Sequence, residues 1–332
     1  MRKGIVWLII VAIFGAILSA CHPQKLEPTL TFEPVSTLPP TATNTSVPTN
    51  TPEATVLLTA TILPTLTEQP TMGSTRIFEV DLMVQVYVPS GEFIMGSDDI
   101  EAQTSTENGR AYPEIPVHTV YLEGYWIDKY EVSNGQFALC VEAGGCSTHY
   151  PAENYTYPGY YVKPEYSNYP VVWVNWYQAR AYCEGAGRRL PTEADWEKAA
   201  RGTDGRKYPW GNEPLSGERA NFCDINCTRS FANYLYNDGY ALTAPVGSYP
   251  AGASPYGAMD MTGNVWEWTG TLIRPYPYDS ADGREDLDAS GERAWRGGPW
   301  SNGVWWMRST VRYRSVPTYW LDNLGFRCAS SE

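Results

Sequence analysis

The chain has 332 residues, a formal net charge of −13, and 18% charged against 14% aromatic residues. An acidic chain repels the phosphates of nucleic acids, so this charge argues against nucleic-acid binding and favours solubility or cation binding. Abundant glycine and aromatic residues with few charges predict well-packed irregular loops in place of long helices.

The first twenty residues predict export. A basic start at Arg2 and Lys3 precedes the apolar run from Ile5 to Leu18, which suits a secretory signal and is short for a bilayer span of about 20 residues. The run ends in Leu-Ser-Ala before Cys21, an order that resembles the bacterial lipoprotein signal. We expect a signal peptide over 1–20 and lipidation of Cys21. The alternative is an ordinary signal with a chance cysteine.

The next segment, residues 21–75, is dominated by threonine and proline. This composition cannot bury a core and favours extended chain, so it predicts a disordered stalk. With a lipid on Cys21, the stalk would hold the domain at a membrane surface. The prediction is an extracytoplasmic lipoprotein of the bacterial cell membrane that faces outward, with its folded domain at 76–332.

The domain contains six cysteines, and an even number in an exported domain indicates three disulfides among fifteen conceivable pairings. Short sequence separations favour Cys140 with Cys146 and Cys223 with Cys227, which leaves Cys183 and Cys328. The expected pairs are Cys140–Cys146, Cys223–Cys227 and Cys183–Cys328. A zinc cluster is the alternative, but the domain has only two histidines and no paired CxxC units, which argues against zinc.

Strand patterns occur early and late in the domain. The segment Met83–Met95 alternates and turns at Ser90-Gly91, which predicts a hairpin, and 117–133 predicts two further strands. Three short strands are expected later, near Gly263–Trp268, Arg293–Gly297 and Gly325–Ala329.

Three helices are predicted from their capping residues. Ser133 is expected to begin a helix that runs to about Ala143. Asn175 would cap a helix from Trp176 to Ala186 that stops at Gly187, and Thr192 a helix over Glu193–Arg201.

Nine motifs then follow one another along the chain. They are VPSGEFIMGS, DKYEVSNGQF, PVVWVNW, AYCEGAGRRLPTEADWEKAARG, YPWGNEP, PVGSYP, YGAMDMTGNVWEWT, RGGPW and NLGFRC. Their order resembles the formylglycine-generating enzyme (sulfatase-modifying factor) domain from Met83 to Ala329. The resemblance implies an α+β, loop-rich fold with a C-type-lectin-like core and low regular secondary structure. It also implies a disulfide matching Cys183–Cys328.

The resemblance further implies structural calcium, which takes roughly six to eight hard oxygen ligands. One expected site uses side chains of Asp260 and Glu267 with carbonyls of Gly263 and Val265. The other uses side chains of Asn221 and Asp238 with carbonyls of Phe222 and Tyr240. The alternative for the first set is that Asp260 caps a turn and Glu267 pairs with an arginine.

The catalytic residues of the family are missing. Its oxidases convert a substrate cysteine to formylglycine with oxygen, and resemble one another in an RGGS stretch holding two cysteines five residues apart, whose thiolates bind Cu(I). Alignment on Gly297-Gly298 places Asn302 and Met307 at those positions and Pro299 at the serine. An amide and a lone thioether do not make a two-thiolate site, so we expect neither copper nor the standard activity. An iron branch of the fold needs three histidines, and the domain has two.

The remaining expectation is a surface-anchored pseudoenzyme that recognises a peptide or a glycan. The ligand-binding candidates are Trp300, Asn302, Trp305, Trp306 and Arg308. Three alternatives stay open. These side chains, with Arg312 and Arg327, could instead be core residues and internal salt bridges. The protein could be an oxidase of protein cysteine with a divergent metal site, or a structural envelope protein.

Overall fold

A computed structural model describes residues 69–99, 113–148 and 159–331. The signal sequence, Cys21 and the predicted stalk up to residue 68 lie outside this range. Within the part that is described, no helix is long and apolar enough to cross a membrane. The first strand begins at Thr75, next to the predicted domain boundary.

Strands from both ends of the domain share one antiparallel sheet, in the order β1-β2-β5-β10. Its members are β1 (Thr75–Phe78), β2 (Met83–Val88), β5 (Tyr125–Asp128) and β10 (Ala329–Ser331). A second, two-stranded sheet pairs β3 (Gly91–Met95) with β4 (His118–Leu122). The start and the end of the domain are thereby joined by backbone hydrogen bonds.

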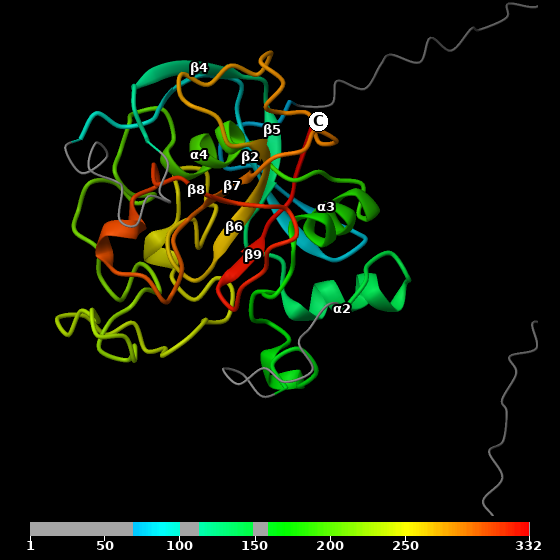
Figure 1. Ribbon diagram of the computed structural model, residues 1–332, viewed down its shortest axis with the longest axis vertical. Coiled ribbons are helices and arrows are strands. Elements are labelled where there is room, and N and C mark those ends of the chain that lie inside the picture. The colour runs from blue at the N-terminus through cyan, green and yellow to red at the C-terminus, as the bar shows by residue number, and fades with distance from the viewer. Residues whose placement is uncertain (1–68, 100–112, 149–158, 332) are drawn as a thin grey trace, which may run out of the picture. The chain divides into compact units, whose positions relative to one another are not determined.

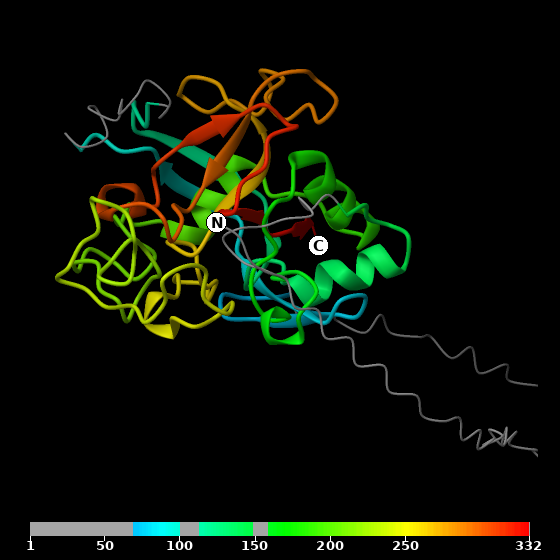
Figure 2. The same cartoon turned by 60° about the horizontal axis from the view of Figure 1, so that its bottom comes forward.

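A third sheet has the order β8-β7-β6-β9. Residues 296–315, which we call the tryptophan-rich stretch, run from its strand β7 to its strand β8. Its strands are β6 (Trp266–Leu272), β7 (Arg293–Arg296), β8 (Tyr313–Ser315) and β9 (Leu324–Phe326). Strand β9 runs parallel to β6, and the other pairs are antiparallel. In Figures 1 and 2 the long irregular loops between α4 and β6 lie on the opposite side from α2 and α3.

The predicted hairpin over Met83–Met95 is wrong in its pairing. Both strands exist, but β2 pairs with β1 and β5 whereas β3 pairs with β4. Pro89 cannot donate a ladder hydrogen bond, and Gly91 has φ +133°, so the chain turns out of one sheet into the next. Strands β1 and β8 were not predicted, and the one strand expected near Gly325–Ala329 is two short strands, β9 and β10, which belong to different sheets.

All three helices begin at the predicted caps, which the structure confirms. They are α2 (Asn134–Glu142), α3 (Trp176–Gly185) and α4 (Glu193–Arg201). In each helix the N-cap side chain accepts the backbone N–H of the residue three positions later. The side chain of that residue in turn accepts the backbone N–H of the N-cap, which makes three capping boxes.

Helix α4 is buried along its whole length and packs against β3, β4, β6 and β7. Its carboxylates are therefore paired inside the protein. Glu193 receives Nε and Nη2 of Arg312 at 2.6 and 2.7 Å. Arg296 contacts both Glu193 and Glu197. The expectation that Arg312 is structural is confirmed.

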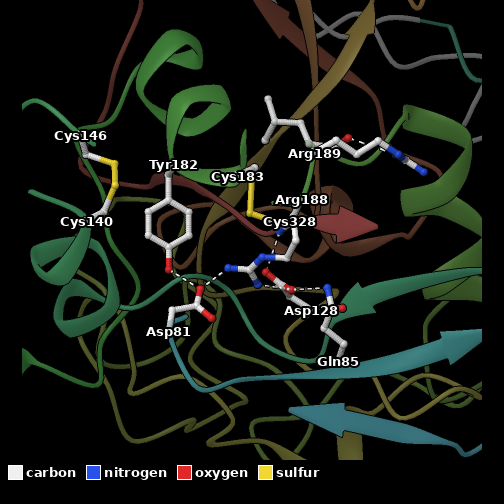
Figure 3. The surroundings of a disulfide bond; sticks show 11 residues. Asp81, Gln85, Asp128, Cys140, Cys146, Tyr182, Cys183, Arg188, Arg189 and Cys328 are labelled. Carbon is white, nitrogen blue, oxygen red and sulfur yellow. Dashed lines mark hydrogen bonds and ion pairs between the residues drawn. A yellow bond between two sulfur atoms is a disulfide. The ribbon is translucent and has the colours of Figure 1, made fainter. Parts of the chain in front are cut away.

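The three predicted disulfides are all present, with S–S distances of 2.08, 2.02 and 2.09 Å. Figure 3 shows Cys183–Cys328 beside a buried ion cluster. There, Arg188 bonds to Asp81 and Asp128, and the hydroxyl of Tyr182 donates to Asp81 at 2.6 Å. This disulfide ties α3 to the chain end across a sequence separation of 145.

Loop length predicts unequal contributions from these disulfides. Replacing Cys183 and Cys328 by alanine is expected to lower the free energy of unfolding by about 5 kcal/mol, because the bond constrains the longest loop of the unfolded chain. Replacing Cys140 and Cys146, whose separation is 6, is expected to cost about 2 kcal/mol. Urea unfolding of both double variants measures the difference, and equal losses would contradict the loop-length argument.

Candidate functional site

The tryptophan-rich stretch leaves β7 through Gly297 and Gly298, whose φ angles are +104° and +71°. A side chain on Gly298 would have its Cβ only 2.5 Å from the Trp306 carbonyl oxygen. Glycine therefore lets the chain fold back closely over a short 3-10 helix, Val304–Met307. This fold brings the two positions of the missing thiols close to the end of the third sheet.

Met307 lies inside the protein. Its exposed fraction is 0%, and it belongs to an apolar cluster with Tyr208, Leu215 and Phe222. Its carbonyl accepts the hydroxyl of Thr262 at 3.2 Å. The thioether sulfur is therefore closed off from solvent and does not face an open site.

Asn302 is partly exposed and belongs to a small polar cluster with Ser301 and Asn323. The Ser301 hydroxyl accepts Nδ2 of Asn323 at 2.7 Å and lies 3.3 Å from Oδ1 of Asn302. Oδ1 of Asn323 is buried and has no hydrogen-bond partner among the described residues. The Asn302 cluster, as we call these three residues, thus retains an unused acceptor. Sequence reasoning missed Ser301 and Asn323, although Asn323 opens the motif NLGFRC.

The five ligand-binding candidates do not share one surface. Trp300 is buried, and its indole N–H is 3.5 Å from the Asp322 carbonyl oxygen. Arg308 is buried and bonds to both carboxylate oxygens of Glu114 at 2.7 and 2.9 Å. For these two, the alternative of core packing and an internal salt bridge describes what is seen.

Trp305 and Trp306 remain partly exposed beside Asn302. The Arg308 guanidinium lies 4.9 Å from the Trp305 ring centre, and Trp306 packs edge-on against Trp266 at 6.0 Å. These contacts hold both indoles in place. Of the five candidates, Asn302, Trp305 and Trp306 are the ones that retain exposed area.

The segment 223–235, which begins with the Cys223–Cys227 disulfide, borders this surface. The Cys223 N–H bonds to the Asn302 carbonyl at 2.9 Å, and a Cβ added to Gly303 would lie 3.8 Å from the Phe231 ring. Phe231 and Leu235 are 58% and 87% exposed, and Ile225 and Tyr234 are exposed as well. Exposed apolar side chains gathered in one place indicate an interaction surface.

Three cavities of about 510, 460 and 290 Å³ lie elsewhere on the described part of the domain. Neither Asn302 nor Met307 lines any of them.

In the first predicted calcium site, one of the expected ligands, Glu267, is already paired with an arginine. Both oxygens of Glu267 are bonded to Arg327 at 2.7 Å, and one also accepts the Trp196 indole N–H. The predicted alternative for Glu267 is thus realised, and Arg327 is structural as expected. Asp260 accepts the Gly247 N–H at 2.6 Å.

Glu131 joins this site, which the sequence did not reveal. Its Oε1 is buried and has no hydrogen-bond partner among the residues described. Burial, together with the charges of Asp260 and Glu267, raises the pKa of Glu131 well above its usual value. Carboxylates crowded in this way are stabilised by a bound cation.

The second predicted calcium set also contains a buried oxygen without a hydrogen-bond partner. Oδ1 of Asn221 is buried without a partner in the described chain. Asp238 accepts backbone N–H groups of Phe222 and Tyr240, and burial raises the pKa of Asp238 to about 7. The Asn264 N–H bonds to the Asn221 carbonyl at 2.9 Å, so the two predicted sites adjoin.

Comparison with known proteins identifies the family. Residues 72–332 match the sulfatase-modifying factor enzyme 1-like domain. The chain belongs to this family. It is 35% identical over 296 residues to the formylglycine-generating enzyme of Streptomyces coelicolor, covering 74% of this chain and 88% of the relative. It is 31% identical over 287 residues to the inactive C-alpha-formylglycine-generating enzyme 2 of Mus musculus, covering 74% and 85%.

The fold is shared with a solved structure. PvdO from Pseudomonas aeruginosa superposes with a TM-score of 0.62 at 24% identity, covering 80% of this chain and all of that one. The predicted α+β, loop-rich architecture is confirmed.

In the first predicted set both oxygens of Glu267 are bonded to Arg327, so Glu267 is not available to calcium. Glu131 beside that set and Asn221 in the second set each keep a buried oxygen without a partner among the described residues. Among the described residues no three His, Cys, Asp or Glu side chains form a metal-binding group, so amide and carbonyl oxygens would have to complete each site. We propose Glu131, Asp260 and the carbonyls of Gly263 and Val265 for one ion. The residues proposed for the other are Asn221, Phe222, Asp238 and Tyr240. Calcium there would fix loops and take no part in chemistry.

Calcium is therefore expected to stabilise the domain. A hundredfold excess over Kd should raise Tm by about 5–10 °C per site, since binding favours only the folded state. Glu131→Gln and Asn221→Ala should each remove part of the rise. Asp288→Asn, which alters a carboxylate that is 87% exposed, is the control. Thermal melts with calcium and with EGTA measure the effect, and an unchanged Tm in the unaltered protein would contradict both sites.

Proposed function

We propose that this protein is a surface-anchored, non-catalytic member of the family that recognises a peptide or a glycan. The observation that carries the proposal is the state of the two thiol positions. Met307 is sealed in the core, and Asn302 offers only an amide. The six cysteines from residue 76 onward are all in disulfides, so no nearby thiol can substitute.

A relative supports the loss of activity. The mouse protein that is 31% identical to this chain is described as inactive. The family therefore includes members that keep the domain without the enzymatic activity, which is the condition proposed for this chain.

Recognition would use the face formed by Asn302, Trp305 and the loop around Phe231. Aromatic rings and exposed apolar side chains supply contact area, and the partly exposed amide of Asn302 supplies a polar contact. The flanking disulfide Cys223–Cys227 holds the loop against Asn302.

The anchoring part of the proposal rests on the sequence. A lipid on Cys21 would attach the protein to the bacterial cell membrane, with the threonine- and proline-rich stalk carrying the domain outward. The domain would then meet ligands outside the cytoplasm. An acidic chain of net charge −13 argues against nucleic acid as that ligand.

Trp305→Ala is expected to weaken ligand binding at least about tenfold, the loss of roughly 1.4 kcal/mol that a well-packed aromatic contact contributes. Peptide and glycan arrays, followed by calorimetry on reproducible hits, measure this. Tyr177→Ala, on helix α3 and 54% exposed in the free domain, is the matched control. Binding that survives Trp305→Ala but not the control would place the site elsewhere, and arrays without hits would favour a structural envelope role.

A direct test separates recognition from oxidase activity. Titration with Cu(I) and oxygen-consumption assays with a cysteine peptide are expected to show neither tight copper binding nor turnover, because thiolates are absent at positions 302 and 307. Copper-dependent turnover would overturn the proposal.

A further inference from the structure

The cavity of about 290 Å³ lies where the turn after β1 meets helices α2 and α3. Its apolar walls are formed by Val80, Leu139, Cys140, Ala143, Tyr182 and Ala186. Figure 3 shows the Tyr182 ring between the Cys140–Cys146 disulfide and Asp81. None of the described residues that line this cavity belongs to the face around Asn302, so the cavity is a separate feature of the domain.

Asp81 is the one charged residue among the described residues that line this cavity, and its charge is already neutralised. It accepts the Met83 N–H at 3.1 Å and the Tyr182 hydroxyl, and it forms an ion pair with Arg188. Another polar lining side chain, Gln136, donates to the Asp81 carbonyl at 3.1 Å. The cavity therefore offers apolar walls in place of a free charge, which suits an apolar group.

Exposed apolar side chains gather at the turn between β1 and β2. Ile77, Val80 and Leu82 are 64, 65 and 73% exposed, and Leu139 of α2 is 53% exposed. Val80 and Leu139 also line the cavity. Apolar side chains gathered beside a concave apolar site indicate a docking surface.

Leu82 gives the clearest sign that this surface has a partner. Its φ angle is +56°, in the left-handed region that is strained for a leucine. Glycine would adopt this conformation without strain. Because the Leu82 side chain is mostly exposed, its packing within the described domain offsets little of that cost. Contact with another molecule would account for a leucine at this position.

Strand β1 is an edge strand, and its strand neighbour among the described residues is β2. The Tyr87 N–H bonds to the Ser74 carbonyl at 3.1 Å, and in an antiparallel ladder every second residue bonds to the partner strand. The backbone N–H and C=O groups of Thr75 and Ile77 therefore point away from β2, towards the open edge. An extended peptide can pair with such groups.

The charge around the cavity is negative. The exposed side chains of Glu79, Glu142 and Glu184 each belong to a residue directly before one that lines the cavity. Glu184 is paired with Arg180, and no described lining residue is a lysine, an arginine or a histidine. A second copy of this chain or an anionic membrane would be repelled, whereas a basic partner would be attracted.

We propose that the edge of β1 and this cavity bind an extended segment of another protein in which apolar residues alternate with lysines or arginines. The segment would add a strand to β1 through Thr75 and Ile77 and place an apolar side chain beside Val80. Its basic residues would face Glu79 and Glu142. This partner is separate from the peptide or glycan proposed for the face around Asn302.

The probe is a labelled peptide, acetyl-Lys-Leu-Lys-Val-Lys-Leu-Lys-amide, titrated with the full-length protein by fluorescence anisotropy. Two matched peptides carry glutamate in place of lysine, or N-methyl groups on the backbone nitrogens. The basic peptide is expected to bind, and each matched peptide at least about tenfold more weakly, because one reverses the charge and the other blocks strand pairing. No binding of the basic peptide, or equal binding of either matched peptide, would overturn the proposal.

Three variants separate docking from folding. Leu82→Gly should weaken binding of the basic peptide at least about tenfold without lowering Tm, because glycine removes the strain together with the contact. Glu142→Lys should reverse the preference between the lysine and glutamate peptides. Val316→Ala, which shortens a 49% exposed side chain after β8, is the control and should bind as the unaltered protein does. A Leu82→Gly protein that melts at a lower temperature and binds normally would show that the leucine serves the fold, against the proposal.

Two further measurements distinguish other occupants of the surface. Sedimentation is expected to show no dimer that Leu82→Gly dissociates, and phosphatidylcholine vesicles should not displace the basic peptide. A dimer lost in Leu82→Gly would assign the surface to a second copy of the chain. Displacement by vesicles would assign it to a membrane, and either result would overturn the proposal.

Discussion

The domain depends on the buried pairing between helix α4 and two arginines, Arg296 at the end of β7 and Arg312 shortly before β8. Glu193 and Glu197 are fully buried, and a carboxylate in that position is tolerated only when it is paired and hydrogen-bonded. Arg296 and Arg312 supply those partners from the two ends of the tryptophan-rich stretch. Removing any one of the four would strand a charge in the core, so the stretch is fixed at both ends by electrostatics as well as by packing.

This constraint explains why the tryptophan-rich stretch does not place positions 302 and 307 together at an open catalytic site. With its ends fixed, the chain between them folds tightly over Gly298, which directs Met307 into the core and leaves Asn302 at the edge. The arginines that a sequence suggests as ligand contacts are occupied internally, as Arg308 is by Glu114. Any recognition is then left to the rim, where Trp305 and the loop around Phe231 are exposed.

The same need to satisfy buried charge runs through the rest of the domain. Arg188 and Arg327 are neutralised by carboxylates from distant segments, whereas Glu131 retains an oxygen without a partner among the described residues. That contrast is why calcium is proposed beside Glu131.

The sequence alone determined what local chemistry decides: three helix starts from Ser133, Asn175 and Thr192, the disulfide pairs, the family and the absence of its thiols. Helix caps and motifs involve residues only a few positions apart, so they can be recognised from the sequence. The tertiary structure decided the separation of β2 from β3 into two sheets, the burial of Trp300 and Arg308, and the inclusion of Ser301, Asn323 and Glu131. Those outcomes depend on partners distant in sequence, from 22 residues between Ser301 and Asn323 to 194 between Arg308 and Glu114, and no local pattern encodes such a partner.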